Sequence, residues 1–438
     1  MERAKRYYLW QNDIPDLSDR RFSSQQQLNE YLDDFDDPNL LFESLLYQRG
    51  TIDKWSWIVD DYIALEQQFQ GTTQTTGMEF GLVRYRNEMN NVFGYVRYVV
   101  PNTDAASQGV ERGMLFSSVN GTQITIDNYR NLLFSENTSL TINLSNYNNG
   151  DPITNGTSIN LTKNSYTENP IHLAKTINEG GKNIGYLMYN GFTSTFDSQL
   201  NQVFSQFKSD GVTELIIDLR YNGGGSVRTA SYLGSMITGQ FTGDVFSKQR
   251  WNEKYMNIIE NQEILIDRFK NKIESSENIN SLNLENIYFI TTSSSASASE
   301  LVINSLEPYI NVFTVGEKTV GKYVGSVTLY DSPNLYTKED INPNHNWAMQ
   351  PIVLEIVNKN DKNDKDGIEP TVEILEDFGN LGVLGNREEP LLARTLQLIT
   401  TGNRAAKSGN TPIVLKTISS SKANYPLYNN MYVNLQSK

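Results

Sequence analysis

The spacing of hydrophobic residues changes along the chain and predicts different kinds of structure. Before about residue 75, the stretches "PNLLFESLLY" and "DKWSWIVDDYIALEQQF" repeat apolar residues with helical period, which predicts two helices, the second capped by Asp53. From about 76 to 165, short alternating runs such as "FGYVRYVV" and "SLTINLSNY" are separated by turn dipeptides such as Asn120-Gly121. This second pattern predicts a small β-rich module.

From about residue 180 the chain alternates strand-like apolar runs with longer helical ones. "NIGYLMY", "ELIIDL", "NIYFITT" and "VFTVGE" are typical of buried strands, while "FDSQLNQVFSQFKSD", "VRTASYLGSMITG" and "ASELVINSLEPY" are typical of helices. The alternation predicts a multidomain α/β protein whose core holds a largely parallel sheet. The expected division is an N-terminal helical region at 1–75, a β-rich module at 76–165, an α/β core at 166–401 and a polar C-terminal tail at 402–438.

Composition narrows the classes of function. The 438 residues include 37 basic and 51 acidic ones, for a net charge of −14, and no long Lys/Arg block, so nucleic acid is not an expected partner. The absence of cysteine excludes disulfides, thiolate metal sites and a cysteine nucleophile. No run reaches the roughly 18 to 20 apolar residues that cross a bilayer, and "MERAKRYYLW" lacks the apolar core of a secretory signal. The chain is therefore expected to be cytoplasmic or to begin after a removed leader.

A serine-rich stretch, "TTSSSASASE" at 291–300, lies between a strand-like and a helix-like run, where a flexible linker is not expected. Ser297 and Glu300 have the spacing of a capping box, in which the serine oxygen caps the helix. Alternatively, Ser297 is a nucleophile, because a helix N-terminus gathers free amides and partial positive charge, and small alanines beside it let a substrate approach. The residues alone leave both interpretations open.

Two further stretches could complete a nucleophilic site. "DLRYNGGGS" at 218–226 follows the strand-like "ELII" and offers either a tight turn or backbone amides for an oxyanion. It lacks the ending of a P-loop and the dinucleotide glycine spacing, so a phosphate site is not expected. "VGEKTVGKYVGS" supplies Lys318 and Lys322, either of which could be the base if burial lowered its pKa, although most lysines are solvated surface charges.

Together these stretches resemble the signature of the C-terminal processing (tail-specific) serine proteases, peptidase family S41. "LIIDLRYNGGGS", "SSASASELVINSLEP" and "VGEKTVGK" occur in the order found in that family. The resemblance implies a ClpP/crotonase-like α/β protease core with Ser297 as the nucleophile and Lys322, 25 residues later, as the base. It also implies an oxyanion hole formed by the amides of Ala298 and Gly224, and it makes Lys318 the runner-up base.

The resemblance extends upstream into the β-rich module. "NTDAASQGVERGMLFSSVNGTQIT" at 102–125 is similar to a PDZ segment, and "GMEFGL" at 77–82 resembles the loop whose amides hold the C-terminal carboxylate of a peptide. These similarities imply a PDZ-like domain that adds a peptide as an extra strand and binds its carboxylate through Phe80, Gly81 and Leu82.

Two positions depart from the family pattern. Ser326 stands four residues after the candidate base, where many members have a glutamine that helps to orient the lysine, so Ser326 becomes the candidate orienting residue. Met114 stands where the PDZ-like segment usually has an aspartate after its second glycine. In this family the PDZ domain often gates the active site, which leads to the hypothesis that a bound peptide tail repositions residues 76–165.

Other candidate sites receive simpler interpretations. "KNDKDGIEPTVE" imitates a calcium loop, but Lys362 stands at the first ligand position and a proline interrupts the run, so no metal is expected. His172 and His345 are the two histidines of the chain, and both are expected to be structural or surface residues because a lysine base makes a catalytic histidine unnecessary.

The expected function is that of a serine endopeptidase, a peptide hydrolase that uses a Ser-Lys dyad and no metal or organic cofactor. Its expected partners are protein or peptide substrates with free C-termini. One alternative is a catalytically silent PDZ-type peptide-binding scaffold. Another is a small-molecule binder or lyase whose glycine amides hold a CoA thioester oxyanion. The family resemblance also suggests the cell envelope, periplasmic or surface-exposed, as the location, and the oligomeric state does not follow from the sequence.

Overall fold

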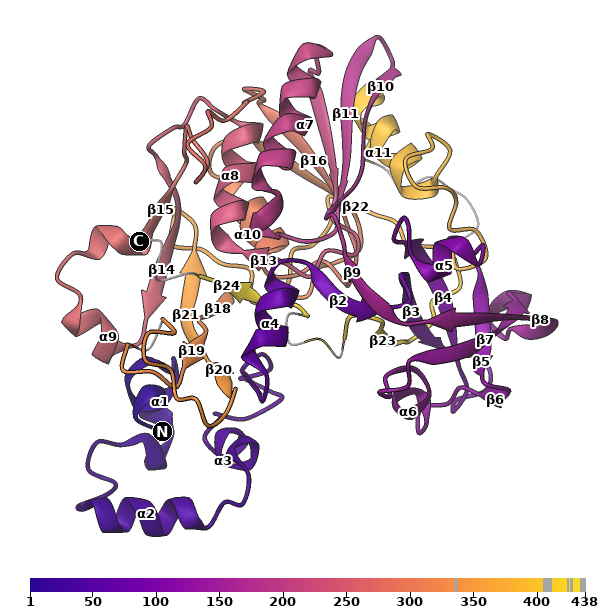
Figure 1. Cartoon of the computed structure of the whole chain (residues 1–438). Helices are drawn as coiled ribbons and strands as arrows, with labels where there is room; N and C mark the ends of the chain where they lie inside the picture. The colour runs from indigo at the N-terminus through magenta and orange to yellow at the C-terminus, as the bar shows by residue number, and fades with distance from the viewer. Residues whose placement is uncertain (335–336, 405–411, 424, 426–427, 434–438) are drawn as a thin grey trace.

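A six-stranded sheet lies at the centre of the core, in the order β10-β11-β12-β16-β17-β22 (Figure 1). The computed structural model describes residues 1–334, 337–404, 412–423, 425 and 428–433. Every strand pair from β11 to β22 is parallel, and β10 pairs antiparallel at the edge, so the largely parallel sheet expected from the sequence is confirmed. The strands are β10 (Ile171–Glu179), β11 (Lys182–Tyr189), β12 (Glu214–Asp218), β16 (Asn286–Thr291), β17 (Asn311–Gly316) and β22 (Val372–Glu373).

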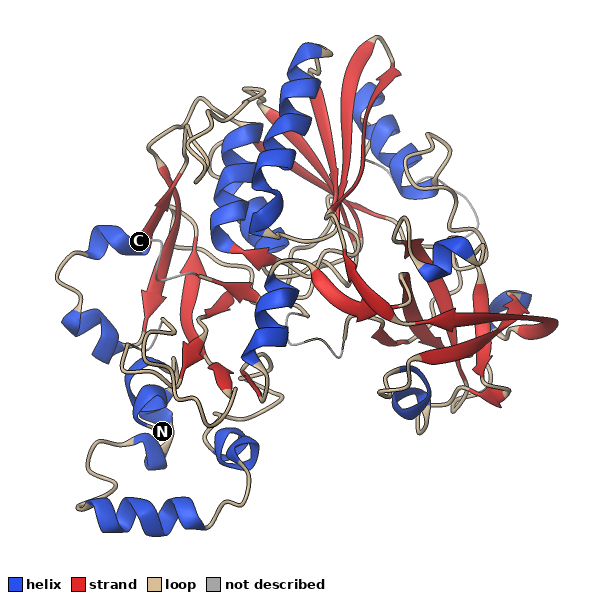
Figure 2. Ribbon diagram, viewed as in Figure 1, coloured by secondary structure: helices blue, strands red, loops and turns tan. Residues whose placement is uncertain are grey.

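Helices cover both faces of this sheet (Figure 2). On one face lie α7 (Asp197–Ser209), α8 (Val227–Ile237) and α10 (Ala298–Leu306), and on the other lies α11 (Pro390–Thr401). Neighbouring residues of β12 reach opposite cores: Leu215 and Ile217 pack with residues of α7, α8 and α10, and Ile216 packs with residues of α11. Burial on both sides explains why "LII" is continuously apolar rather than alternating.

A second sheet stands beside the first and contributes one wall of the candidate site. Its order is β13-β24-β18-β21-β14-β15, and β24, from the C-terminal end of the chain, runs parallel to both β13 and β18. The strands are β13 (Gly225–Ser226), β24 (Met431–Tyr432), β18 (Val324–Ser326), β21 (Ile352–Val357), β14 (Val245–Trp251) and β15 (Ile266–Arg268), with α9 (Glu253–Ile258) after β14. Short 3-10 turns occur at Gln11–Asp13, Pro15–Leu17, Asn148–Gly150, Ser194–Phe196 and Gln262–Leu265.

The β-rich module has its own sheet and its own hydrophobic core. The sheet order is β23-β3-β4-β5-β7-β8, and β6 pairs with β5. The elements are β3 (Met78–Arg84), β4 (Val92–Val99), α5 (Asp104–Ser107), β5 (Leu115–Val119), β6 (Thr122–Gln123), α6 (Tyr129–Leu133), β7 (Ser139–Asn146), β8 (Ile153–Thr162) and β23 (Thr417–Ser420). A two-stranded ribbon of β2 (Thr72–Thr75) and β9 (Asn164–Thr167) joins the module to its neighbours. The edge strand β23 comes from the region expected to be a polar tail, so the described part of that tail contains strands.

The N-terminal region is less helical than the sequence predicts. Its helices are α1 (Glu2–Tyr7), α2 (Gln25–Asp33), α3 (Pro38–Ser44) and α4 (Tyr62–Phe69), and β1 (Trp57–Val59) forms a small sheet with β20 (Ala348–Gln350) and β19 (Leu329–Tyr330). The expected helix beginning after Asp53 is therefore wrong in its first half, and Asp61 caps α4 instead. The physical reason is tertiary: buried Asp53 accepts hydrogen bonds from Tyr8 and Ser56, which fixes a turn, and the following residues pair with β20.

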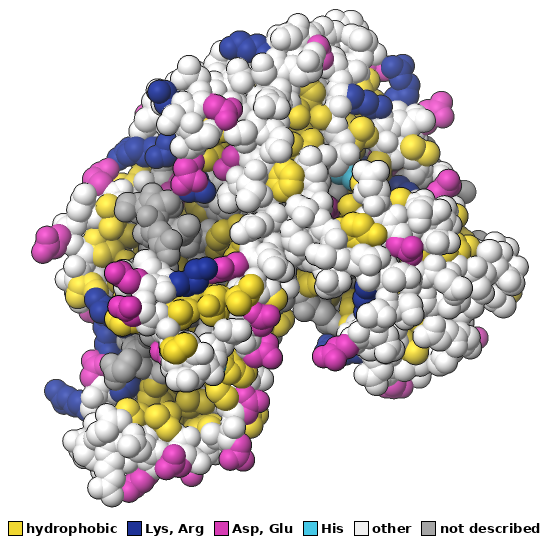
Figure 3. Space-filling model, viewed as in Figure 1, with side chains coloured by type: hydrophobic (Ala, Val, Ile, Leu, Met, Phe, Trp, Pro, Cys, Tyr) yellow, Lys and Arg dark blue, Asp and Glu magenta, His cyan; other side chains and the backbone are white. Residues whose placement is uncertain are grey.

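The surface shows no concentration of positive charge on the face drawn in Figure 3, where acidic and basic side chains are scattered. The same view shows a hollow between the lobe formed by the N-terminal region and the lobe formed by the β-rich module. Within the described residues, none of the helices combines the length and the apolar composition needed to span a membrane.

Candidate active site

Three motif-bearing loops meet at one edge of the parallel sheet. The "DLRYNGGG" loop follows β12, the serine-rich loop follows β16, and the loop with Lys322 follows β17. Because β12, β16 and β17 are adjacent and parallel, their carboxyl ends lie together, which is where open α/β sheets bind ligands. The fold therefore gathers residues that are about a hundred positions apart in the sequence.

The other serines of the run connect two of these loops. Ser295 Oγ donates to the carbonyl of Leu219 at 2.8 Å, and Ser299 Oγ donates to the carbonyl of Asn222 at 3.0 Å. The amide of Ala296 donates to the same Asn222 carbonyl at 3.1 Å. The serines that flank position 297 thus satisfy buried backbone groups and hold the glycine loop against the start of α10.

Ser297 differs from Ser295 and Ser299 because its hydroxyl makes no hydrogen bond with the described residues. It is the N-cap of α10, it is 0% exposed, and its Oγ has no hydrogen-bond partner among the described residues. Its backbone is at φ 67° and ψ −116°, a conformation that costs a non-glycine residue about 1–3 kcal/mol. A strained, unpartnered hydroxyl at a helix N-terminus has the features of a nucleophile, and it makes no cap hydrogen bond of its own.

Glu300 makes the capping-box contact with the Ser297 amide that the helical spacing predicts, and it also contacts the lysine loop. Its carboxylate accepts hydrogen bonds from the amides of Ser297 at 2.7 Å, Lys322 at 2.9 Å and Gly321 at 2.6 Å, and from the Thr319 hydroxyl at 2.5 Å. Burial raises the pKa of Glu300, and these four hydrogen bonds oppose that shift. The sequence predicts the contact with Ser297 from helix spacing, but gives no sign of the link to the lysine loop.

Lys322 is buried and has a lowered pKa. It is 1% exposed, and burial lowers its pKa to about 7, although the carboxylates of Asp53 and Glu300 oppose that change. Its Nζ donates to Asn430 Oδ1 at 3.2 Å and stands 5.6 Å from the centre of the Trp55 ring. Ser297 and Lys322 line the same small cavity. A lysine in these surroundings can be neutral near pH 7 and accept a proton.

Lys318, the runner-up base, lies in a different environment. Its side chain is 47% exposed and its Nζ forms an ion pair with Glu369 at 2.6 Å. The hydrogen bond to Glu369 raises the pKa of Lys318, which keeps the ammonium charged. Its environment is that of the solvated surface lysine considered in the sequence analysis.

Ser326 reaches the lysine through an intermediate residue. Ser326 Oγ donates to Asn430 Oδ1 at 3.0 Å, and this is the same oxygen that accepts from Lys322 Nζ. The Asn430 amide nitrogen donates to Gln350 Oε1 at 2.7 Å, which fixes the orientation of the amide. Asn430, Gln350 and Trp55 were absent from the residues expected in the site. None of the three lies in a recognised motif. Asn430 comes from the C-terminal end of the chain, Gln350 from β20 and Trp55 from the N-terminal region.

The two residues expected to form the oxyanion hole are neighbours of Ser297: Ala298 follows it in the sequence, and Gly224 lies beside it in space. Ala298 is the first residue of α10, a position whose amide has no partner within the helix. Gly224 has φ 108°, and a Cβ there would stand 2.7 Å from Ser297 Oγ, so no other residue fits beside the serine. The Gly224 amide donates to Asn222 Oδ1 at 2.8 Å, so an incoming oxyanion has to displace that side chain to use it.

The expected carboxylate-binding residues lie on β3, away from the serine. The amide of Phe80 donates to Ser421 Oγ at 3.1 Å, and Gly81 and Leu82 pair with residues of β23. The two histidines have separate partners: His172 packs on the ring of Tyr98 with centres 4.9 Å apart, and His345 contacts Asp331 at 3.2 Å.

The fold and the gathered loops define a class of protein: an α/β core that brings three motif-bearing loops together at one edge of its sheet, with an appended β-rich module. The profile of peptidase family S41 matches residues 183–374, and the profile of the peptidase S41 N-terminal domain matches residues 1–57. The two profiles together match more than half of the chain. The chain belongs to peptidase family S41, a family of serine peptidases, as its motifs predict.

Solved structures share this fold. A crystal structure of a protein from Bacteroides fragilis NCTC 9343 that is assigned to the S41 proteases superposes with a TM-score of 0.69 at 24% identity, covering 91% of this chain and 96% of that one. The photosystem II D1 C-terminal processing protease superposes with a TM-score of 0.50 at 18% identity, covering 90% of this chain and 94% of that one. At these identities the likeness shows a shared mixed α/β fold. The comparison with curated proteins found no match.

Proposed function

We propose that this chain is a serine endopeptidase of the C-terminal processing type, in which Ser297 is the nucleophile and Lys322 is the general base. The observation that supports this most directly is that one cavity is lined by Ser297 and Lys322. The serine hydroxyl has no hydrogen-bond partner in the described part of the chain, and the lysine is buried with a pKa of about 7. Serine with lysine is a known variant of the serine triad.

In the proposed reaction, neutral Lys322 takes the proton of Ser297 as its oxygen attacks a peptide carbonyl. The amides of Ala298 and Gly224 stabilise the tetrahedral oxyanion, and each such donor is typically worth about 3–4 kcal/mol. The protonated lysine then gives its proton to the leaving amine, and an acyl-enzyme forms. Water attacks the acyl-enzyme with Lys322 again as base, which releases the second product and restores the serine.

The β-rich module is proposed to recruit the substrate as a PDZ-like domain. Strand β23 pairs with the edge of β3 in the way that a peptide binds by strand addition. Phe80, Gly81 and Leu82 of β3 lie along this edge. Movement of the module on binding is the proposed gating step. Family membership leads us to propose that the protein is located in the cell envelope. Fractionation of the source cells would measure this location directly.

The first test is the pH dependence of peptide hydrolysis. Because the base has to be neutral, kcat/KM should rise about tenfold per pH unit below the pKa of about 7 and level off above it. Lys322→Met should lower the plateau by about 10²- to 10⁴-fold, the range of general-base effects. The matched control is Lys318→Met, which removes an exposed lysine and should leave the profile unchanged. A flat profile between pH 5.5 and 9 would remove lysine from the mechanism. All assays contain a chelator so that a contaminating metalloprotease does not contribute.

A second test addresses substrate recruitment. An unfolded protein substrate with a free apolar C-terminus should show a KM about tenfold or more below that of the same chain with an amidated C-terminus, because a carboxylate accepts stronger hydrogen bonds from amides than a neutral amide does. The control is a peptide too short to extend from the active site to the β-rich module. Its free and amidated forms should have the same KM. Equal KM values for both forms of the long substrate would exclude carboxylate recognition.

A silent peptide-binding scaffold is the second candidate function. Two observations favour it: Ser297 is fully buried, and the Gly224 amide is already hydrogen-bonded to Asn222. A scaffold predicts that the chain binds the free-tail substrate but yields no new N-termini by mass spectrometry, and that Ser297→Ala binds equally well.

A further inference from the structure

The C-terminal segment, defined here as residues 412–423 and 428–433, lies along both parts of the proposed site. Its strand β23 pairs antiparallel with β3, with Ser420 opposite Gly81 and Ser419 opposite Leu82. The Ser421 amide donates to the Phe80 carbonyl at 2.9 Å. The chain's own segment therefore occupies the edge of β3 to which a peptide would add.

Specific contacts hold the segment at this edge. Ile418 packs against the core of the β-rich module, which includes Tyr129 and Leu133 of α6. Ser421 Oγ donates to the buried Glu79 carboxylate at 2.5 Å, and Lys422 forms an ion pair with Glu168 at 3.1 Å. One apolar anchor with two polar ones is the pattern of a docked peptide rather than of a loosely placed tail.

The other end of the segment enters the catalytic centre. Strand β24 lies between β13, which begins directly after Gly224, and β18, which begins two residues after Lys322 (Figure 1). It pairs parallel with both, and the Val433 amide donates to the Ser326 carbonyl at 3.1 Å. The segment therefore lies between the strand that follows the candidate oxyanion glycine and the strand that follows the candidate base.

This placement covers the reacting groups. Asn430 Oδ1 accepts from Lys322 Nζ, and its backbone oxygen would lie 2.8 Å from a Cβ on Gly224, beside Ser297. The large cleft that leads from Glu79 and Arg97 to Gly224 is lined by Asn429 and Asn430 and does not include Ser297. With the segment in place, Ser297 is fully buried and is not among the described residues that line this cleft.

We propose that the C-terminal segment is an intramolecular occupant of the peptide path, which keeps the enzyme latent until a substrate tail displaces it from β3. The inference rests on the proposed function, because it assigns the same path to the substrate. One edge of β3 pairs with one strand at a time, so docking of the segment and capture of a substrate exclude each other. Displacement at β3 then loosens the connected strand β24 and uncovers Ser297.

The accessibility of position 297 can be measured without relying on catalysis. The chain has no cysteine, so Ser297→Cys introduces a single thiol whose rate of alkylation by iodoacetamide reports how often that position is uncovered. Ser205→Cys places the same thiol on an exposed position of α7 and corrects for intrinsic reactivity. In the full chain, the thiol at position 297 should be alkylated far more slowly than the thiol at position 205.

Release of the segment should increase this rate. Ile418→Asp in the Ser297→Cys chain removes the apolar anchor and should raise the alkylation rate by about tenfold or more. Val414→Asp is the matched control, because the same change falls in the same segment at a residue that is 76% exposed. A synthetic peptide with the sequence of residues 412–423, added to the otherwise unaltered Ser297→Cys chain, should raise the rate without any change in the segment itself.

The outcomes separate this inference from the proposed function. Faster alkylation with Ile418→Asp and with the peptide, together with faster peptide hydrolysis by Ile418→Asp in the chain that retains Ser297, supports latency. Alkylation rates that remain unchanged overturn it. Faster alkylation with slower hydrolysis also overturns it, because the segment then assists catalysis. Faster alkylation with no hydrolysis in any form means that the proposed function fails while the segment still covers position 297.

Discussion

Ser297→Ala should abolish peptide hydrolysis, with kcat lowered by at least about 10⁴-fold, because the acyl-enzyme cannot form without the hydroxyl oxygen. The fold should be retained, since Ser297 Oγ has no hydrogen-bond partner to lose among the described residues and the helix cap is made by Glu300. Turnover is measured in the full chain and in the Ile418→Asp background, so that a covered serine is not mistaken for an inactive one.

Ser297→Gly provides a second, independent readout at the same position. The serine sits at φ 67°, where a side chain is strained and glycine is not. The glycine variant should lose activity as completely as the alanine variant, yet its free energy of unfolding should exceed that of Ser297→Ala by about 1 kcal/mol. Chemical denaturation of the two variants gives this difference directly. Residual hydrolysis in either variant would assign the nucleophile to another residue. Equal stability of the two variants would mean that a side chain at position 297 does not strain the backbone.

Much of the site was predictable because it lies in three motifs that each follow a strand. Apolar runs identify β12, β16 and β17, and adjacent parallel strands have to place the loops after them at one edge. The family resemblance implied that the glycine loop, Ser297 and Lys322 belong to one site, and the three do lie together in the fold. The sequence also predicted the contact of Glu300 with Ser297, because helical spacing alone determines that pair.

The remaining contacts depend on packing between distant segments. Asn430 lies 108 residues from Lys322, and it contacts the lysine only because β24 is inserted beside β18. Trp55 reaches the lysine because the region around Asp53 forms a buried turn, at the point where helical periodicity predicted a helix. Local propensity could not indicate either contact, because a single polar or aromatic residue in a segment without periodic pattern carries no signal of its partner.

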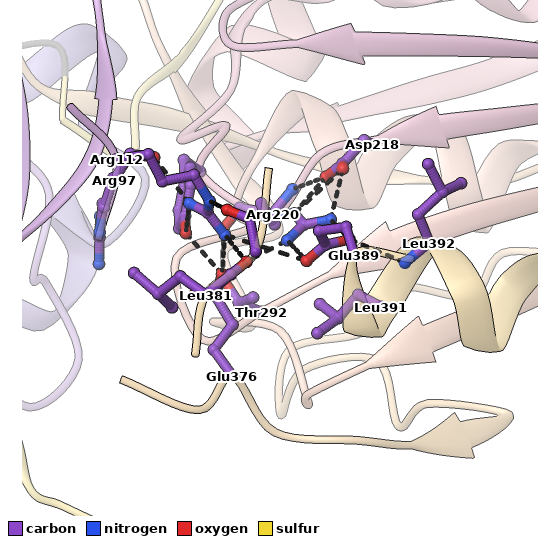
Figure 4. Close-up of polar contacts among 12 residues, drawn as sticks. Arg97, Arg112, Asp218, Arg220, Thr292, Glu376, Leu381, Glu389, Leu391 and Leu392 are labelled. Carbon is purple, nitrogen blue, oxygen red and sulfur yellow. Dashed lines mark hydrogen bonds and ion pairs between the residues drawn. The ribbon is translucent and has the colours of Figure 1, made fainter. Parts of the chain in front are cut away.

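The largest loss of stability is expected from Arg220→Met, which removes a cation from the buried polar cluster drawn in Figure 4. Arg220 is fully buried and binds Asp218 at 2.7 Å and Glu389 at 2.7 Å, and it approaches Glu376 at 3.4 Å. Arg112 is a second cation of this cluster and binds Glu376 at 3.0 Å. Removing one cation from a buried network leaves uncompensated carboxylates, so the free energy of unfolding should fall by about 3–5 kcal/mol.

The pH dependence of this loss distinguishes stranded charge from lost packing. Burial alone would raise the pKa of Glu376, and in the intact chain Arg112 and Arg220 hold it below its usual value. Without Arg220 the pKa of Glu376 should rise, because burial is then opposed by Arg112 alone, so the folded variant binds protons more readily as the pH falls and its deficit in stability shrinks. The variant should therefore lose less stability, relative to the unaltered chain, at pH 5 than at pH 7.5 in denaturant titrations.

A charge-compensated variant separates the cost of stranded charge from the cost of lost packing. Arg220→Met combined with Asp218→Asn and Glu389→Gln removes the stranded charges while keeping side-chain volumes similar, and it should recover most of the loss. A deficit that is equal at both pH values and persists in the triple variant would assign the effect to packing rather than to charge. Because the Arg220 carbonyl accepts a hydrogen bond from Thr292 at the start of the serine loop, recovered stability should be accompanied by recovered turnover. The cluster would then stabilise the position of the glycine loop relative to the serine loop.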